Sequence, residues 1–110
     1  MENFILSRKK IALIKDKVFV LSIPVSLNPA DVVFIIESKL KFEESVHVEF
    51  VLKTMTGALN DSAIVLPVEV KGPLTRVRPC DIVKFEHKTY LLFSVKASNG
   101  MDIELSVESK

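Results

Sequence analysis

The chain has 110 residues, of which 48% are hydrophobic and 26% charged, so it is long enough for one domain with its own core. Its 15 basic and 14 acidic residues give a formal net charge of +1, which excludes the strongly positive balance of a dedicated duplex-binding protein. The single cysteine excludes an internal disulfide, and no apolar run approaches the ~18 residues that a membrane span needs. We therefore expect one cytoplasmic domain over residues 1–110 with no membrane association.

Short segments rich in Val, Ile, Phe and Leu, each bounded by polar residues, predict strands along the whole chain. In chain order they are Phe4–Ile14, Lys17–Ile23, Val32–Phe42, Val46–Met55, Ala63–Val70, Ile82–Glu86, Thr89–Ala97 and Met101–Val107. Gly57–Asp61 is expected to be a loop. About eight short strands in one chain predict an all-β fold, either a small antiparallel β-sandwich or a partly closed β-barrel.

The segment 29–40 is compatible with a helix as well as with a strand. Asn28 followed by Pro29 and Asp31 is a good helix start, because Asn caps well and Pro fits the first turn. The next five residues, 32–36, include four β-branched side chains, which are poor in helices. We therefore expect a strand here and keep the helix as the alternative.

The strand interpretation also provides a partner strand. If Glu43-Glu44-Ser45 is a hairpin loop, Phe42 faces Val46 on the apolar side and Lys39 faces Glu49 on the polar side. His47 then points to solvent.

Prolines mark the places where a central ladder cannot continue, because proline lacks a backbone N–H. Pro24 and Pro29 bracket Val25–Asn28, which we expect to be a loop or a crossing between sheets. Pro67 predicts that its strand lies at a sheet edge or contains a bulge.

Apolar and polar residues alternate from Asp81 to Val107, and the turn Ser98-Asn99-Gly100 selects the register. A three-residue loop with Gly100 in the left-handed conformation sets Phe93 opposite Leu105 and Val95 opposite Ile103. A two-residue Asn-Gly loop would instead set Val95 opposite Glu104. We therefore predict a hairpin with the three-residue loop.

These alternations predict one shared core. Its expected members are Leu13, Val18, Val20, Phe34, Ile36, Leu40, Val48, Phe50, Leu52, Ile64, Leu66, Val68, Val83, Leu91, Phe93, Val95, Ile103 and Leu105.

The run Arg76-Val77-Arg78-Pro79-Cys80-Asp81-Ile82-Val83 resembles the Arg-Pro-Gly-Asp-x-Val turn that leads into a strand in many SH3-like barrels. Cys80 stands where that pattern has glycine, so a turn with negative φ throughout is expected. A functional alternative is an exposed Cys80 thiol whose thiolate is favoured by the charge of Arg78.

Other chemistry has little support in the sequence. His47, His87 and Cys80 could supply three zinc ligands, but none of them has the close spacing typical of a zinc site. No nucleophile elbow, phosphate-binding glycine loop or paired-carboxylate motif is present. We expect a protein that is not an enzyme, with no metal, no cofactor and no small-molecule substrate.

Basic residues and outward-facing apolar residues predict two kinds of partner. Two groups of cations could follow a phosphate backbone on a small OB-like or SH3-like barrel, namely Arg8, Lys9, Lys10, Arg76 and Arg78. Apolar residues expected on outward faces could instead contact a protein, namely Val33, Ile35, Val51, Tyr90 and Leu92. We favour a protein-interaction or assembly module, a homo-oligomer or a subunit of a virion-type or secretion-type complex, with nucleic-acid binding as the alternative.

Overall fold

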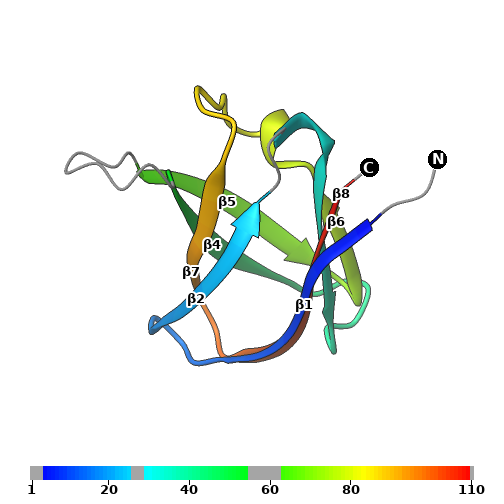
Figure 1. The fold of residues 1–110 in the computed structure, drawn as a ribbon. Coiled ribbons are helices and arrows are strands. Elements are labelled where there is room, and N and C mark those ends of the chain that lie inside the picture. Colours follow the sequence, from blue (N-terminus) through cyan, green and yellow to red (C-terminus); the bar gives the residue numbers. More distant parts are fainter. Residues whose placement is uncertain (1–3, 26–28, 55–62, 110) are drawn as a thin grey trace.

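The structure, a computed structural model, describes residues 4–25, 29–54 and 63–109, which fold into two packed antiparallel sheets (Figure 1). The first sheet has the order β1-β8-β3-β6, with β1 (Phe4–Leu13), β8 (Met101–Ser109), β3 (Val32–Ser38) and β6 (Leu74–Val77). The second sheet has the order β2-β7-β4-β5, with β2 (Val18–Val25), β7 (Tyr90–Ala97), β4 (Ser45–Thr54) and β5 (Ala63–Lys71). The predicted all-β fold is therefore confirmed, and of the two predicted architectures it is the sandwich.

The core lies between the two sheets and is built from alternate residues of each strand. Phe34 on β3 and Phe50 on β4 are fully buried and meet edge to face across the sandwich, with ring centres 5.6 Å apart. Most of the predicted core is buried: Leu13, Phe34, Ile36, Val48, Phe50, Leu52, Leu66, Val68, Val95, Ile103 and Leu105. Leu40, Ile64 and Val83 pack against it while remaining partly exposed.

The segment after Asn28 is a strand, and the helical alternative is wrong. A single 3₁₀ turn, η1 (Pro29–Asp31), uses the helix-start residues, and β3 begins immediately at Val32. The β-branched run then pairs with β8 on one side and β6 on the other. Pro29 and Asp31 therefore belong to a single turn, and the β-branched side chains that follow determine the strand.

Both predicted hairpins are wrong, because their strands belong to different sheets. β3 and β4 do not pair with each other, and neither do β7 and β8, so each short loop carries the chain from one sheet to the other. In the described chain the only glycine with positive φ is Gly72, at +62°, and Gly100 is not left-handed as predicted. A strand with apolar residues on both faces can pair with its neighbour in sequence or with a strand of the other sheet. Alternation alone therefore did not identify the pairing.

A bulge in β7 inverts the predicted faces of its first half. Val51 of β4 pairs with Ser94 and Leu52 pairs with Leu92, so Phe93 is an additional residue. As a result Tyr90 and Leu92 point into the core, with 1% and 0% exposure, and Leu91 and Phe93 remain half-buried. The outward positions predicted for Tyr90 and Leu92 are wrong, as are the core positions predicted for Leu91 and Phe93.

A second irregularity corrects the prediction for β2. Its register against β7 shifts between Val20 and Ile23, and the buried residues are Leu21, Ile23 and Val25. Val18 and Val20, predicted in the core, are exposed on the opposite face.

The connection before β7 also differs from the prediction. Ile82–Glu86 is not a strand; it follows the 3₁₀ turn η2 (Pro79–Asp81) as irregular chain, with Val83 and Phe85 packed against the core. The apolar–polar alternation of this segment therefore reflects the packing of Val83 and Phe85 against the core and not pairing with a neighbouring strand. The negative φ expected at Cys80 is confirmed, because η2 is a 3₁₀ turn and Asp16 is the one non-glycine residue of the described chain with positive φ.

Pro67 lies on β5, an edge strand, as its missing N–H predicts. The loop predicted at Gly57–Asp61 and most of the crossing Val25–Asn28 lie outside the described residues. None of the helices in the described part of the chain has the length and apolar character needed to span a membrane.

Candidate functional site

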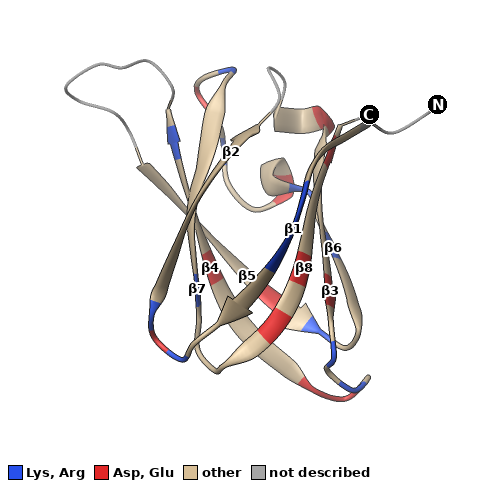
Figure 2. Cartoon of the chain, turned by 60° about the horizontal axis from the view of Figure 1, so that its bottom comes forward, with Lys and Arg blue, Asp and Glu red and all other residues tan. Residues whose placement is uncertain are grey.

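The exterior of the first sheet carries charges of both signs. The register places Arg8, Ser106, Ile35 and Arg76 in one row across the four strands, with Lys10, Glu104 and Glu37 in the next row. Arg8 Nε lies 3.5 Å from Glu104 Oε1 and 3.4 Å from Ser106 Oγ. Figure 2 shows the acidic positions of β8 between the basic positions of β1 and β6.

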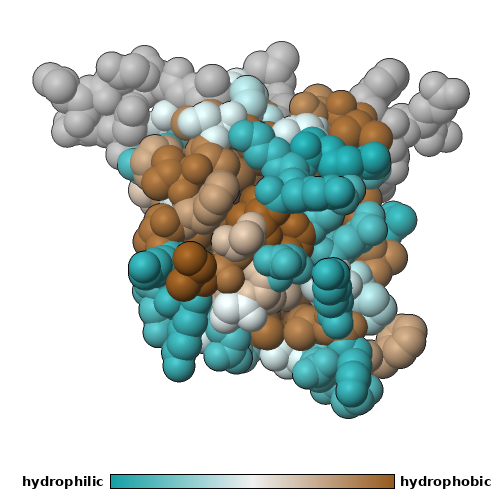
Figure 3. All heavy atoms as spheres, turned by 90° about the horizontal axis from the view of Figure 1, so that it is seen from below, coloured by the Kyte–Doolittle hydropathy of each residue, from teal (hydrophilic) through white to brown (hydrophobic). Residues whose placement is uncertain are grey.

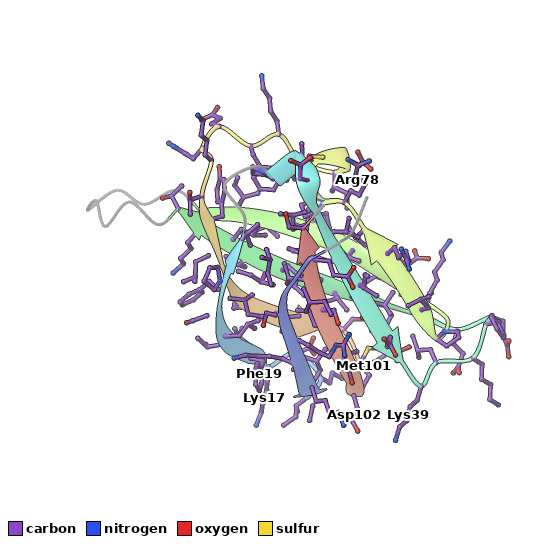
Figure 4. All side chains as sticks on the ribbon, turned by 45° about the vertical axis from the view of Figure 1, so that its right-hand side comes forward. Lys17, Phe19, Lys39, Arg78, Met101 and Asp102 are labelled. Carbon is purple, nitrogen blue, oxygen red and sulfur yellow. The ribbon has the colours of Figure 1, made fainter. Side chains whose placement is uncertain are left out.

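The five basic residues predicted to bind nucleic acid do not converge on one groove. Arg8, Lys10 and Arg76 share the first sheet's exterior with acidic residues, and Lys9 is on the opposite face of β1. Arg78 lies at the upper end of the molecule in Figure 4 and donates a 2.8 Å hydrogen bond from Nη2 to the carbonyl oxygen of Ala30. A phosphate backbone following these residues would pass over carboxylates, which weakens the electrostatic attraction that such binding requires.

Val33 and Ile35 do face outward on the first sheet, as predicted, but they are not an exposed patch. Both are buried, with 9% and 7% exposure. Arg76 lies beside Ile35 in the ladder and Glu108 beside Val33. Long polar side chains of this kind can cover apolar neighbours while their charged ends stay in water.

The residues of the alternative chemical sites are dispersed. Cys80, Asp81 and His87 line one open hollow, where Cys80 Sγ lies 3.9 Å from Asp81 Oδ1. His47 is far from this hollow in the fold, on the exterior of the second sheet beside Glu69. Among the described residues no group of three potential ligands could hold a metal ion. Arg78, expected beside the Cys80 thiol, is directed to Ala30 instead.

One band across the exterior of the second sheet is apolar on all four strands, between rows that carry charged residues. We call these residues the apolar belt: Val18, Val20, Leu91, Phe93, Val51 and Val65. Val20 and Val65, at the two edges, are 60% and 52% exposed. Val51 is the one residue of the predicted contact set that faces outward and remains accessible.

The apolar belt is continuous from β2 to β5. Ser94 lies between Val20 and Val51 in the ladder and is itself buried, and Val65 follows Val51 on β5. At one side of the belt Lys53 Nζ lies 3.7 Å from the centre of the Phe93 ring. Seen from below, hydrophobic surface is concentrated on the side that carries β2 and β7, and the other side is largely hydrophilic (Figure 3).

The four edge strands each carry a feature that hinders pairing with a further strand. β1 has a bulge between Ile5 and Ser7 followed by three consecutive basic residues, and β6 has only four residues. β2 contains a register shift and Pro24, and β5 contains Pro67. These features disfavour strand addition and leave the sheet faces as the available surfaces.

A second exposed apolar feature is one that the sequence interpretation missed. Phe42, expected inside a strand opposite Val46, is 88% exposed at the tip of the turn between β3 and β4. The turn is firmly held, because Glu44 Oε1 accepts from the backbone N–H of Lys41 (2.9 Å) and Gly72 N–H donates to Glu44 O (2.9 Å). The charged neighbours on both sides of Phe42 were the available signal for an exposed turn.

The chain matches no protein-family model, and the comparisons with curated proteins and with solved structures find no match either.

Proposed function

We propose that this protein is a non-catalytic interaction domain that binds another protein surface through the apolar belt and so forms part of a larger assembly. The observation that carries the proposal is the contrast between the two exteriors. The first sheet presents charges of both signs around buried Val33 and Ile35. The second sheet presents the apolar belt, which has outward valines on β2, β4 and β5 and Leu91 and Phe93 on β7. A contiguous exposed apolar area is uncommon on a monomer and is typical of interaction sites.

Two further observations support binding by the sheet face. The edge strands are protected against strand addition by bulges, prolines, charge or short length. The net charge of +1 gives little electrostatic resistance to association with a partner or with another copy.

Site-specific crosslinking tests the proposal with a control that the fold provides. A photoreactive phenylalanine derivative is placed at Val65 on the second sheet or, in a separate variant, at Leu74 on the first. Both residues lie on edge strands and have nearly equal exposure, 52% and 51%. Irradiation in cells of the protein's own source is expected to give a discrete crosslinked product from position 65 and none from position 74.

Competition with unlabelled protein tests whether the crosslinked product from position 65 depends on the apolar belt. Excess unlabelled wild-type protein is expected to suppress the product from position 65, whereas a Val20→Glu variant is expected not to. Absence of a discrete product from position 65, or equal products from both positions, would contradict the proposed function.

A further inference from the structure

We infer that the surface bound by the apolar belt is the belt of a second copy of this chain, in a two-fold symmetric dimer. This inference rests on the proposed function and specifies its partner. It depends on one pair of charges beside the belt, Glu49 and Lys96, whose arrangement is self-complementary.

Glu49 and Lys96 are the central charged residues of this exterior. They lie opposite each other on β4 and β7, the two inner strands of the second sheet, in the row next to that of Val51 and Ser94. Among the described residues neither of them closes an ion pair. Both charges are therefore available to a partner.

A two-fold axis between β7 and β4, parallel to the strands, brings each row of the sheet opposite the same row of the second copy in reverse order. Lys96 of one copy then faces Glu49 of the other, and the contact occurs twice because the interface is isologous. In the next row Val20 faces Val65 of the second copy, also twice. In these two rows opposite charges meet and apolar side chains meet, so this part of the face complements itself.

The available area sets the expected strength of this dimer. Four strands about 4.8 Å apart and about eight residues long give a face of about 19 by 26 Å. Two such faces bury about 1,000 Å² or slightly more, which is the lower limit for a specific interface. We therefore expect a dimer that dissociates in the micromolar range, with the closest contact at the centre because twisted sheets diverge at their corners.

Charge exchange between copies tests the inference directly. Lys96→Glu and Glu49→Lys each place like charges opposite each other twice in a homodimer, and each is expected to raise the dimer dissociation constant at least tenfold in sedimentation equilibrium. An equimolar mixture of the two variants restores both intermolecular contacts, because the new glutamate of one faces the new lysine of the other. The mixture is expected to form a heterodimer within about threefold of the wild-type dissociation constant.

The mixture distinguishes contacts between copies from effects inside one chain. The change inside each variant is the same whether the variant is alone or mixed, so tighter association in the mixture must come from contacts between copies. Wild-type protein that remains monomeric up to about 1 mM, or a mixture no stronger than its components, would overturn the dimer. A position-65 crosslink whose mass differs from two copies of the chain would overturn the dimer and leave the proposed function standing. No discrete crosslink from position 65 would overturn both.

Discussion

The ammonium group of Lys53 lies 3.7 Å from the centre of the Phe93 ring, and the two residues come from neighbouring strands of the second sheet. Phe93 is the additional residue of the β7 bulge, so its ring lies on the exterior and not in the core. The contact joins the bulge to β4 at one side of the apolar belt. An aromatic face attracts a cation placed above it.

Loss of this contact is expected to weaken the fold slightly. Lys53→Met keeps most of the aliphatic stem and removes the charge, and Phe93→Leu removes the ring. Each is expected to lower the free energy of unfolding, with a coupling energy of about 0.5–1 kcal/mol between the two positions. Urea unfolding of both single variants and the double variant measures this coupling, and strictly additive effects would show that the contact contributes nothing.

Phe50 is buried in the core and Phe42 is exposed in a turn, so truncation of the two side chains is expected to have different effects on stability. Phe50→Ala opens a cavity at the contact with Phe34 and is expected to cost about 3–5 kcal/mol of unfolding free energy. Phe42→Ala changes an exposed turn and is expected to stay within about 0.5 kcal/mol of wild type. Denaturant titration of the two variants measures both changes in the free energy of unfolding. A large loss of stability with Phe42→Ala would mean that this side chain packs against the protein.

Gly72 is required by its backbone conformation and by its neighbour. Its φ is +62°, and a Cβ added there would lie 3.3 Å from Cα of Phe42. Gly72→Ala is therefore expected to cost at least about 1 kcal/mol. Gly100→Ala is the matched control, because an added Cβ would meet Leu13 O at 3.4 Å without left-handed strain, and a small effect is expected in thermal unfolding. Equal losses would contradict this account of Gly72.

Arg78 is expected to act as a structural residue. Its hydrogen bond to the Ala30 carbonyl joins the chain entering η2 to η1, and Arg78→Ala is expected to cost about 1 kcal/mol. Lys84→Ala, an exposed lysine nearby, serves as the control and is expected to be neutral. If Arg78→Ala instead left stability unchanged and abolished salt-sensitive binding to single-stranded DNA, a role in nucleic-acid recognition would be favoured.

Element positions were largely predictable from sequence because side-chain type and alternation act locally. The run from Val32 to Ile36 specified β3 despite a good helix start, and Pro67 specified an edge strand. β6 was missed because Leu74–Val77 has only four residues and forms through pairing with β3.

Strand partners and the belt were not predictable, because they depend on which sheet each strand joins. The turn Ser98-Asn99-Gly100 is short enough for a hairpin and also for a crossing between sheets. The extra residue at Phe93 then reversed the faces of the first half of β7, so Tyr90 and Leu92, predicted to face outward, point into the core. One bulge therefore determines which side chains of β7 lie on the exterior of the sheet.

Backbone amide chemical shifts measured by NMR between about 10 µM and about 1 mM protein show whether the apolar belt binds a second copy, because they report self-association residue by residue. A dimer formed through the apolar belt is expected to give concentration-dependent shifts at Val20, Val51, Val65 and Lys96 on the second sheet. Lys10, Glu37 and Leu74 on the first sheet are expected to stay unchanged. Shifts confined to the first sheet, or no shifts over the whole range, would contradict this dimer.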